Sequence, residues 1–74
     1  MNYNKQFKFQ ESDDPCMYDD QYILKADENI YIQVSDKYIV NEYVEEEQSS
    51  YFKGEFISLN EAFKRAVDVY VSGI

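Results

Sequence analysis

The side chains best suited to chemistry are scarce in this chain of 74 residues, which contains no His and only one Cys. Without His, the commonest general base and transition-metal ligand is missing, and so is any Ser or Cys nucleophile that a His would activate. The single cysteine, Cys16, has Asp13, Asp14, Asp19 and Asp20 close to it in the chain. Because neighbouring carboxylates disfavour a thiolate, we expect Cys16 to be an inert, reduced thiol.

The four aspartates around Cys16 are hard oxygen ligands of the kind that Ca²⁺ and Mg²⁺ prefer. Their spacing matches no EF-hand loop, which needs alternating acidic or amide residues, a Gly and a distal Glu. Carboxylate pairs also hydrolyse glycosides, but so short a chain has little room for a sugar-binding cleft. Two glycines, Gly54 and Gly73, cannot build a phosphate-binding loop. The sequence therefore predicts a protein that is not an enzyme and has neither a metal nor a cofactor.

The composition predicts one small folded domain over residues 1–74. The chain has 15 Asp and Glu against 7 Lys and Arg, a formal charge of −8, yet 45% of its residues are hydrophobic and 18% aromatic. That apolar content is too high for a disordered chain. No apolar run approaches a membrane span, and residues 1–10 lack the apolar core of a secretory signal. We expect a cytoplasmic protein, in keeping with the lone cysteine.

Short runs of β-branched and aromatic residues predict a meander of four or five strands. Polar and apolar residues alternate over 3–10, which indicates a half-buried strand, and residues 11–20 form an acidic loop. Further strands are expected at 22–26, 30–35, 38–46 and 51–57, with a turn at 47–50 and Gly54 as a candidate bulge.

The register of the hairpin over 30–46 stays open between two alternatives. A two-residue turn places Ile39 and Tyr43 on the face of Ile32, whereas a longer turn places Tyr38 and Val40 there, together with Val44.

A helix is expected over 59–72, where apolar residues recur at helical spacing. Ser58 and Glu61 have the spacing of a capping box, and Gly73 suits the left-handed position after the last turn, with Ile74 as its hydrophobic contact. The expected buried face consists of Leu59, Ala62, Phe63, Ala66, Val67 and Tyr70.

These elements predict an α+β fold, a small antiparallel sheet over 3–10 and 22–57 with one C-terminal helix packed on one face. Five strands span about 19 Å between outer axes, whereas a helix is about 10 to 12 Å across. One helix can therefore cover only two or three strands. The sheet must curl, or a second copy or another protein must cover the remainder.

The excess charge is concentrated in two segments. Residues 11–20 contain five acidic and no basic residues, 38–52 contain four glutamates and no basic residue, and 53–74 are neutral. Such a chain repels nucleic acid and attracts basic protein surfaces. Tyrosines, which are enriched at interfaces, lie among these acids. The candidate partner-binding residues are Asp13, Asp14, Tyr18, Asp19, Asp20, Glu42, Tyr43, Glu45, Glu46 and Glu47. The alternative reading is that the tyrosines reflect strand propensity and the carboxylates serve solubility.

The acidic runs from Asp13 to Asp20 and from Glu42 to Glu47, on so short a chain, resemble the small acidic inhibitors that phages encode against bacterial defence nucleases, such as anti-CRISPR proteins. The resemblance implies that the acidic segments occupy a basic nucleic-acid channel in the host cytoplasm, by mimicking DNA or by blocking a moving part. Nuclease immunity proteins and antitoxins fit the same features. The competing hypothesis is a small structural or accessory domain that self-associates through its sheet as a homodimer.

Overall fold

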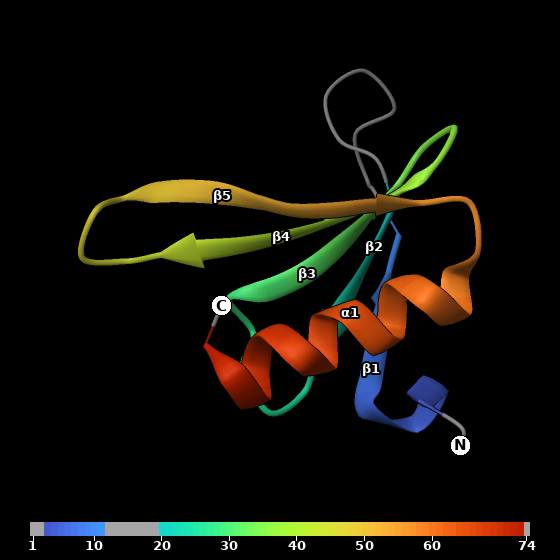
Figure 1. The fold of residues 1–74 in the computed structure, drawn as a ribbon, viewed down its shortest axis with the longest axis horizontal. Coiled ribbons are helices and arrows are strands. Elements are labelled where there is room, and N and C mark those ends of the chain that lie inside the picture. The colour runs from blue at the N-terminus through green and yellow to red at the C-terminus, as the bar shows by residue number, and fades with distance from the viewer. Residues whose placement is uncertain (1–2, 12–19, 74) are drawn as a thin grey trace.

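Five antiparallel strands and one C-terminal helix form two layers in the computed structural model, which describes residues 3–11 and 20–73 (Figure 1). The elements are a 3₁₀ helix η1 (Tyr3–Gln6), β1 (Phe7–Gln10), β2 (Asp20–Leu24), β3 (Ile30–Val34), β4 (Tyr38–Val44), β5 (Ser49–Phe56) and α1 (Leu59–Ser72). The strands follow the chain order β1-β2-β3-β4-β5 across the sheet. The predicted α+β meander is thereby confirmed. The predictions for Cys16 and Ile74 lie outside the described residues.

The prediction of a strand over 3–10 is wrong in its first half, where Tyr3–Gln6 form η1 instead. Strand β1 pairs only with β2, and Phe7 lies opposite Leu24, the last residue of that strand. Beyond this pair the chain turns toward β3, so residues 3–6 have no neighbouring strand to pair with. A 3₁₀ turn satisfies backbone groups locally, and the backbone N–H of Lys25 donates to the carbonyl oxygen of Gln6 at 2.9 Å.

The longer turn between β3 and β4 settles the register that the sequence left open. Val34 pairs with Tyr38 and Ile32 with Val40, so Ile39 lies on the opposite face. The three connecting residues, 35–37, are held by a hydrogen bond from the backbone N–H of Ser35 to the carbonyl oxygen of Lys37 at 3.1 Å.

Strand β4 ends earlier and β5 begins earlier than predicted, so the turn between them comprises residues 45–48. The backbone N–H groups of Glu47 and Gln48 donate to the carbonyl oxygens of Val44 and Glu45, both at 3.2 Å. Glu45 and Glu46 therefore do not extend β4, because these turn hydrogen bonds reverse the chain directly after Val44.

A bulge interrupts the pairing of β4 with β5, at the position where Gly54 was a candidate. Gly54 pairs with Val40 but Phe52 pairs with Asn41, so Lys53 is the extra residue. Gly54 has a φ of 151°, in the region that favours glycine.

The core lies between α1 and the sheet, and Phe63 is its central ring. The Phe63 ring stacks on Phe7 with centroids 4.5 Å apart, and it meets Tyr22 edge-on at 5.2 Å. The fully buried side chains of the sheet include Leu24, Ile30, Ile32 and Val40. Small residues of α1, Ala62 and Ala66, are also fully buried and allow the helix to approach these strands closely.

The helix has its predicted bounds but not the whole of its predicted buried face. Val69 is 1% exposed and belongs to the core, because it follows Ala66 by three residues on the same stripe. Tyr70, predicted to be buried, is 48% exposed. Tyr70 continues the side of Phe63 two turns later, where the helix no longer contacts the sheet on that side.

The two ends of α1 differ in how well the sequence predicts them. Gly73 adopts the left-handed conformation at φ 73°, and its N–H donates to the carbonyl oxygen of Val69 at 2.8 Å, as predicted. The capping box is wrong, since the Ser58 side chain makes no cap hydrogen bond. Ser58 has the extended backbone of an N-cap, but it is exposed and water can satisfy the first N–H groups of the helix.

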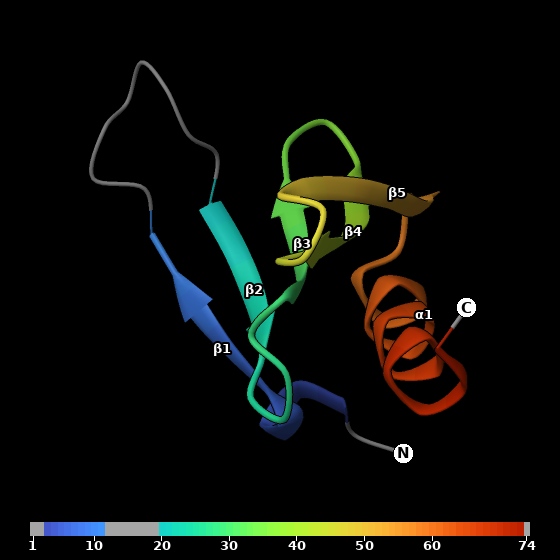
Figure 2. The same cartoon turned by 90° about the vertical axis from the view of Figure 1, so that its left-hand side faces the viewer.

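Sheet twist reduces the uncovered area without removing it. Figure 2 shows β1 and β2 turned away from β4 and β5, with α1 on one side of the sheet only. This twist brings Phe7 on β1 against Phe63 of the helix. Within residues 3–11 and 20–73, no helix lies on the far face of the sheet, and the end of the β4–β5 hairpin projects beyond α1 (Figure 1).

Phe63→Ala should lower the free energy of unfolding by about 3 to 5 kcal/mol, because the substitution leaves a cavity between α1, β1 and β2. Urea unfolding followed by circular dichroism measures this loss. Tyr70→Ala is the matched control and should change stability by about 0.5 kcal/mol or less. Equal stability of the Phe63→Ala variant and the parent would contradict the packing described here.

Candidate functional site: an acidic hairpin arm

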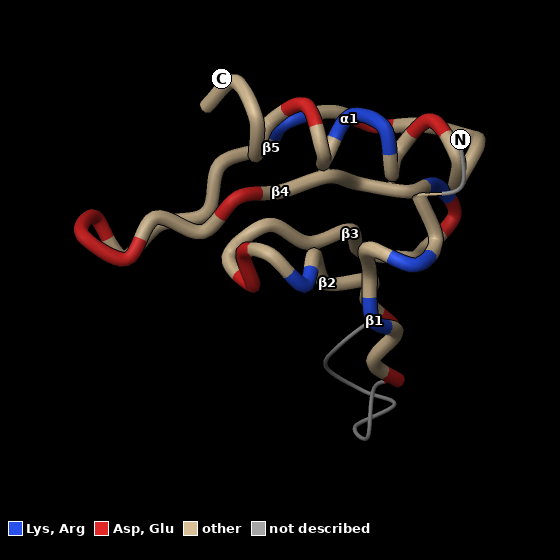
Figure 3. Tube along the Cα trace, turned by 90° about the horizontal axis from the view of Figure 1, so that it is seen from below, with Lys and Arg blue, Asp and Glu red and all other residues tan. Residues whose placement is uncertain are grey.

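The part of the β4–β5 hairpin beyond the bulge, residues 41–52, is the most distinctive surface of the molecule, and we call it the acidic arm. It contains Glu42, Glu45, Glu46 and Glu47 and no Lys or Arg. Figure 3 shows the acidic turn at its end, well separated from the helix and from the basic residues. Four negative charges are thus placed on one projecting ribbon.

Pairing between β4 and β5 holds the arm together up to its last residues. Asn41 pairs with Phe52, and Val44 pairs with Ser49 directly before the turn. The turn requires one unfavourable backbone conformation, because Gln48 has a φ of 52°. In this left-handed conformation the Cβ of Gln48 lies close to a backbone carbonyl oxygen, so the turn carries some local steric strain.

The three consecutive glutamates lie on the turn rather than along a strand. The sequence predicted that Glu45 and Glu46 end the strand over 38–46 and that Glu47 begins the turn over 47–50. In the turn, Glu45, Glu46 and Glu47 are all exposed, and together they form a compact acidic tip. The carboxylates of Glu45, Glu46 and Glu47 are therefore clustered at the end of the arm and do not form a line along a strand.

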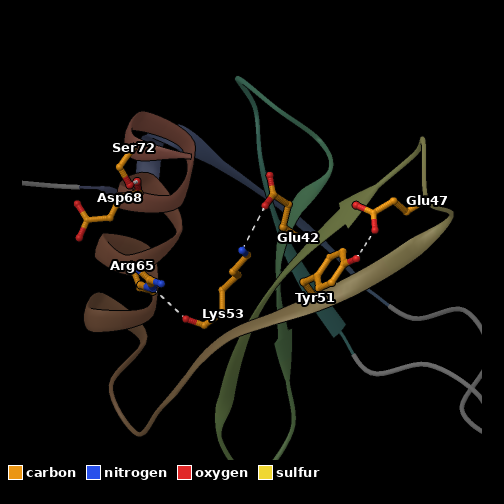
Figure 4. A network of polar contacts seen from close by, with 7 residues as sticks. All are labelled: Glu42, Glu47, Tyr51, Lys53, Arg65, Asp68 and Ser72. Carbon is orange, nitrogen blue, oxygen red and sulfur yellow. Dashed lines mark hydrogen bonds and ion pairs between the residues drawn. The ribbon is translucent and has the colours of Figure 1, made fainter. Parts of the chain in front are cut away.

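On the helix side of the arm, polar groups are linked from the tip to the base (Figure 4). The Tyr51 hydroxyl donates a hydrogen bond to a carboxylate oxygen of Glu47. Lys53 Nζ lies 5.9 Å from the centre of the Tyr51 ring and 3.7 Å from Oε1 of Glu42. Arg65 Nε donates to the carbonyl oxygen of Lys53 at 2.8 Å. The bulge residue Lys53 thus connects the arm to α1.

On the other side of the arm two aromatic rings face solvent. Phe52 is 66% exposed and Tyr43 is 36% exposed. Counting back from Phe56 in steps of two would place Phe52 on the helix side. The extra residue of the bulge reverses this alternation. The bulge therefore decides that Phe52 faces away from the helix.

The described residues bring together only part of the predicted binding set. Glu42, Tyr43 and the three tip glutamates share the arm, but Asp20 lies elsewhere. Asp20 pairs with Val34 at one end of β3, whereas Glu42 pairs with Ile30 at the other end. The remaining predicted residues, Asp13, Asp14, Tyr18 and Asp19, lie outside the described residues.

Other features of the described surface offer less chemistry. An open groove of about 370 Å³ between α1 and β5 is lined by Phe56, Glu61, Lys64, Arg65 and Asp68, whose charges balance. Within residues 3–11 and 20–73, no cluster of three or more His, Cys, Asp or Glu residues could hold a metal ion. In the same residues, no helix has the length and apolar character needed to cross a membrane.

No protein-family model, curated protein or solved structure matches this chain. Its function must therefore be argued from the charge and shape of the acidic arm.

Gln48→Gly should stabilise the protein by up to about 1 kcal/mol, because Gly adopts the left-handed conformation without the steric cost that Gln pays. The midpoint of urea unfolding measures the gain. Gln48→Ala serves as the control, since Ala removes the side chain but retains the steric cost, and it should show no such gain. A lower midpoint for Gln48→Gly than for Gln48→Ala would contradict the turn geometry.

The hydrogen bond from Tyr51 to Glu47, together with the negative charge of that carboxylate, raises the pKa of the Tyr51 phenol above its ordinary value of 10.0. Because the folded state holds this proton more tightly, the interaction stabilises the fold at neutral pH and is lost as pH rises through the raised pKa. Glu47→Gln should lower the pKa of Tyr51 toward 10.0. A pH titration followed by NMR of the Tyr51 ring protons measures this pKa. Glu45→Gln is the control and should leave the pKa of Tyr51 raised, as in the parent. An identical pKa in the parent and Glu47→Gln would exclude this contact.

Proposed function

We propose that this chain is a non-catalytic binding protein that inhibits a nucleic-acid-binding enzyme by placing its acidic arm in the enzyme's basic site. The observation that carries the proposal is the arm itself, which has four glutamates, no basic residue and exposed aromatic rings on a projecting ribbon.

The charge of the arm supports attraction to Lys and Arg side chains. The tip glutamates are exposed, and the nearest cation on the hairpin, Lys53, is engaged with Glu42. An uncompensated cluster of this kind accelerates encounter with a basic surface. The attraction extends about 8 Å at physiological ionic strength.

The shape of the arm supports entry into a cleft. Two paired strands are narrow, with axes about 4.8 Å apart, so the arm can reach cations that line a groove too narrow for the whole domain. Carboxylates held there compete with nucleic-acid phosphates for the same Lys and Arg groups. The inhibition is therefore competitive and needs no catalytic residue.

Phage-encoded inhibitors of defence nucleases, nuclease immunity proteins and antitoxins are the classes of protein in which we would expect such an arm. The proposal concerns the mechanism that these classes share. It does not depend on residues 11–20, because the arm alone supplies the carboxylates and the shape.

Reversing the charge of two tip residues should weaken binding to a cationic probe. A fluorescent oligo-arginine peptide should bind the parent protein, and its anisotropy should report affinity falling as salt rises past about 0.15 M. Glu45→Lys combined with Glu46→Lys should weaken binding by about tenfold or more, while Glu47 and its bond to Tyr51 are retained.

The matched control changes the same number of charges away from the arm, with Glu61→Lys combined with Asp68→Lys on α1. This variant should lose much less affinity. Equal losses from the two double variants would show that net charge alone drives binding, and the arm mechanism would be wrong.

A displacement assay tests inhibition in the same system. The parent protein should release a labelled DNA duplex from an arginine-rich peptide, and the variant with two lysines at the tip should release much less. Failure of the parent to displace DNA at concentrations that saturate the peptide would contradict competitive inhibition.

A further inference from the structure

The face of the sheet opposite α1 has a centre without charged residues. Register places Ile23, Tyr31, Asn41 and Phe52 in one row across β2 to β5. The next row contains Gln21, Gln33 and Ile39. We call these seven residues the uncharged face. On a chain with a formal charge of −8, such an area is unexpected for a surface that only contacts water.

Two ion pairs among the described residues flank the uncharged face. At the β1 edge, Lys8 donates a hydrogen bond to Glu28, which lowers the pKa of that carboxyl below its ordinary value of 4.5. At the β5 edge, Lys37 Nζ lies 3.8 Å from Oε2 of Glu55. The face therefore has an uncharged centre and a polar rim, which is the usual anatomy of a protein interface.

Three polar side chains of the uncharged face, Asn41, Gln33 and Tyr31, each make a hydrogen bond. Asn41 Nδ2 donates to Oε1 of Gln33 at 2.8 Å, and Asn41 is nearly buried. The Tyr31 hydroxyl lies 3.2 Å from the Ser50 hydroxyl at the edge of the face. Covering this surface would leave these hydrogen bonds in place, which reduces the cost of desolvating it. Phe52, exposed at its end, would gain most from being covered.

We propose that the uncharged face binds the same face of a second copy of this chain. A basic partner would be drawn to the acidic arm instead, since the uncharged face has no net charge to attract it. Two copies of an acidic protein repel each other at most orientations, but this face meets its own image without opposing like charges. A two-fold axis makes such a contact self-complementary.

The proposed dimer is weak and leaves the tips accessible. Five strands span about 19 Å and a five-residue strand about 17 Å, an area well below the roughly 800 Å² per partner of a standard interface. We therefore expect a dissociation constant of the dimer in the micromolar range or above. Glu45, Glu46 and Glu47 lie in the turn beyond the paired residues, so a dimer would present two acidic tips.

Sedimentation equilibrium between about 10 µM and about 1 mM tests the dimer, a range that spans weak association. The parent should show a monomer–dimer equilibrium that strengthens as salt rises, because salt screens the repulsion between two acidic chains. Phe52→Asp places a like charge on both sides of the contact and should weaken the dimer by about tenfold or more.

Val71→Asp is the matched control, since Val71 is also exposed, lies on α1 and changes the charge equally. It should dimerise like the parent. Circular dichroism of each variant establishes that it is folded. A parent that stays monomeric throughout, or a folded Phe52→Asp variant that dimerises like the parent, would overturn the proposal. The salt response distinguishes the dimer from the proposed function, because the dimer should strengthen as salt rises whereas oligo-arginine binding should weaken.

Discussion

The packing of one helix against a five-stranded sheet is the constraint on which the rest of this structure depends. Phe63 lies between Phe7 and Tyr22, so a single ring joins α1 to β1 and β2. Ala62 and Ala66 allow the same helix to approach β3 and β4 closely. A helix about 10 to 12 Å across cannot cover a sheet about 19 Å wide. The twist of the sheet recovers part of the difference, and the acidic arm and the uncharged face remain in solvent.

These two uncovered surfaces differ in the force that would hold a partner. The acidic arm offers exposed carboxylates at its tip, so binding there is electrostatic, rapid and weakened by salt. The uncharged face offers Phe52, Tyr31 and paired amides, so binding there depends on apolar burial and strengthens when salt screens repulsion. One small domain can therefore combine a charged contact for a foreign protein with a neutral contact for its own copy. The bulge at Lys53 decides which residue of β5 takes which side of the arm, so that Tyr51 lies on the helix side and Phe52 belongs to the uncharged face.

Local patterns predicted what depends on near neighbours in the chain. The bounds of α1 followed from its helical period, and Gly73 followed from the left-handed conformation that only Gly adopts without strain. Features that depend on distant residues were missed or left open. Residues 3–6 alternate like a strand, but the strand pairing of β1 with β2 ends at Phe7 and Leu24. The register of β4 depended on one residue of turn length, and the bulge reversed the side of Phe52. The charge concentration and a turn at 47–50 were predicted, but the position of the turn at 45–48 and the projection of the arm depend on the pairing of β4 with β5.

The central claim is that the arm, rather than the overall charge, contacts a basic partner, and an NMR titration with unlabelled oligo-arginine tests it most directly. Amide resonances of the ¹⁵N-labelled protein should shift between Glu42 and Tyr51, with the largest changes at the tip residues 45–48. Resonances of Glu55, Glu61 and Asp68, which are equally acidic but lie off the arm, should move little. Shifts of similar size at all acidic residues, or an unshifted tip, would contradict the account.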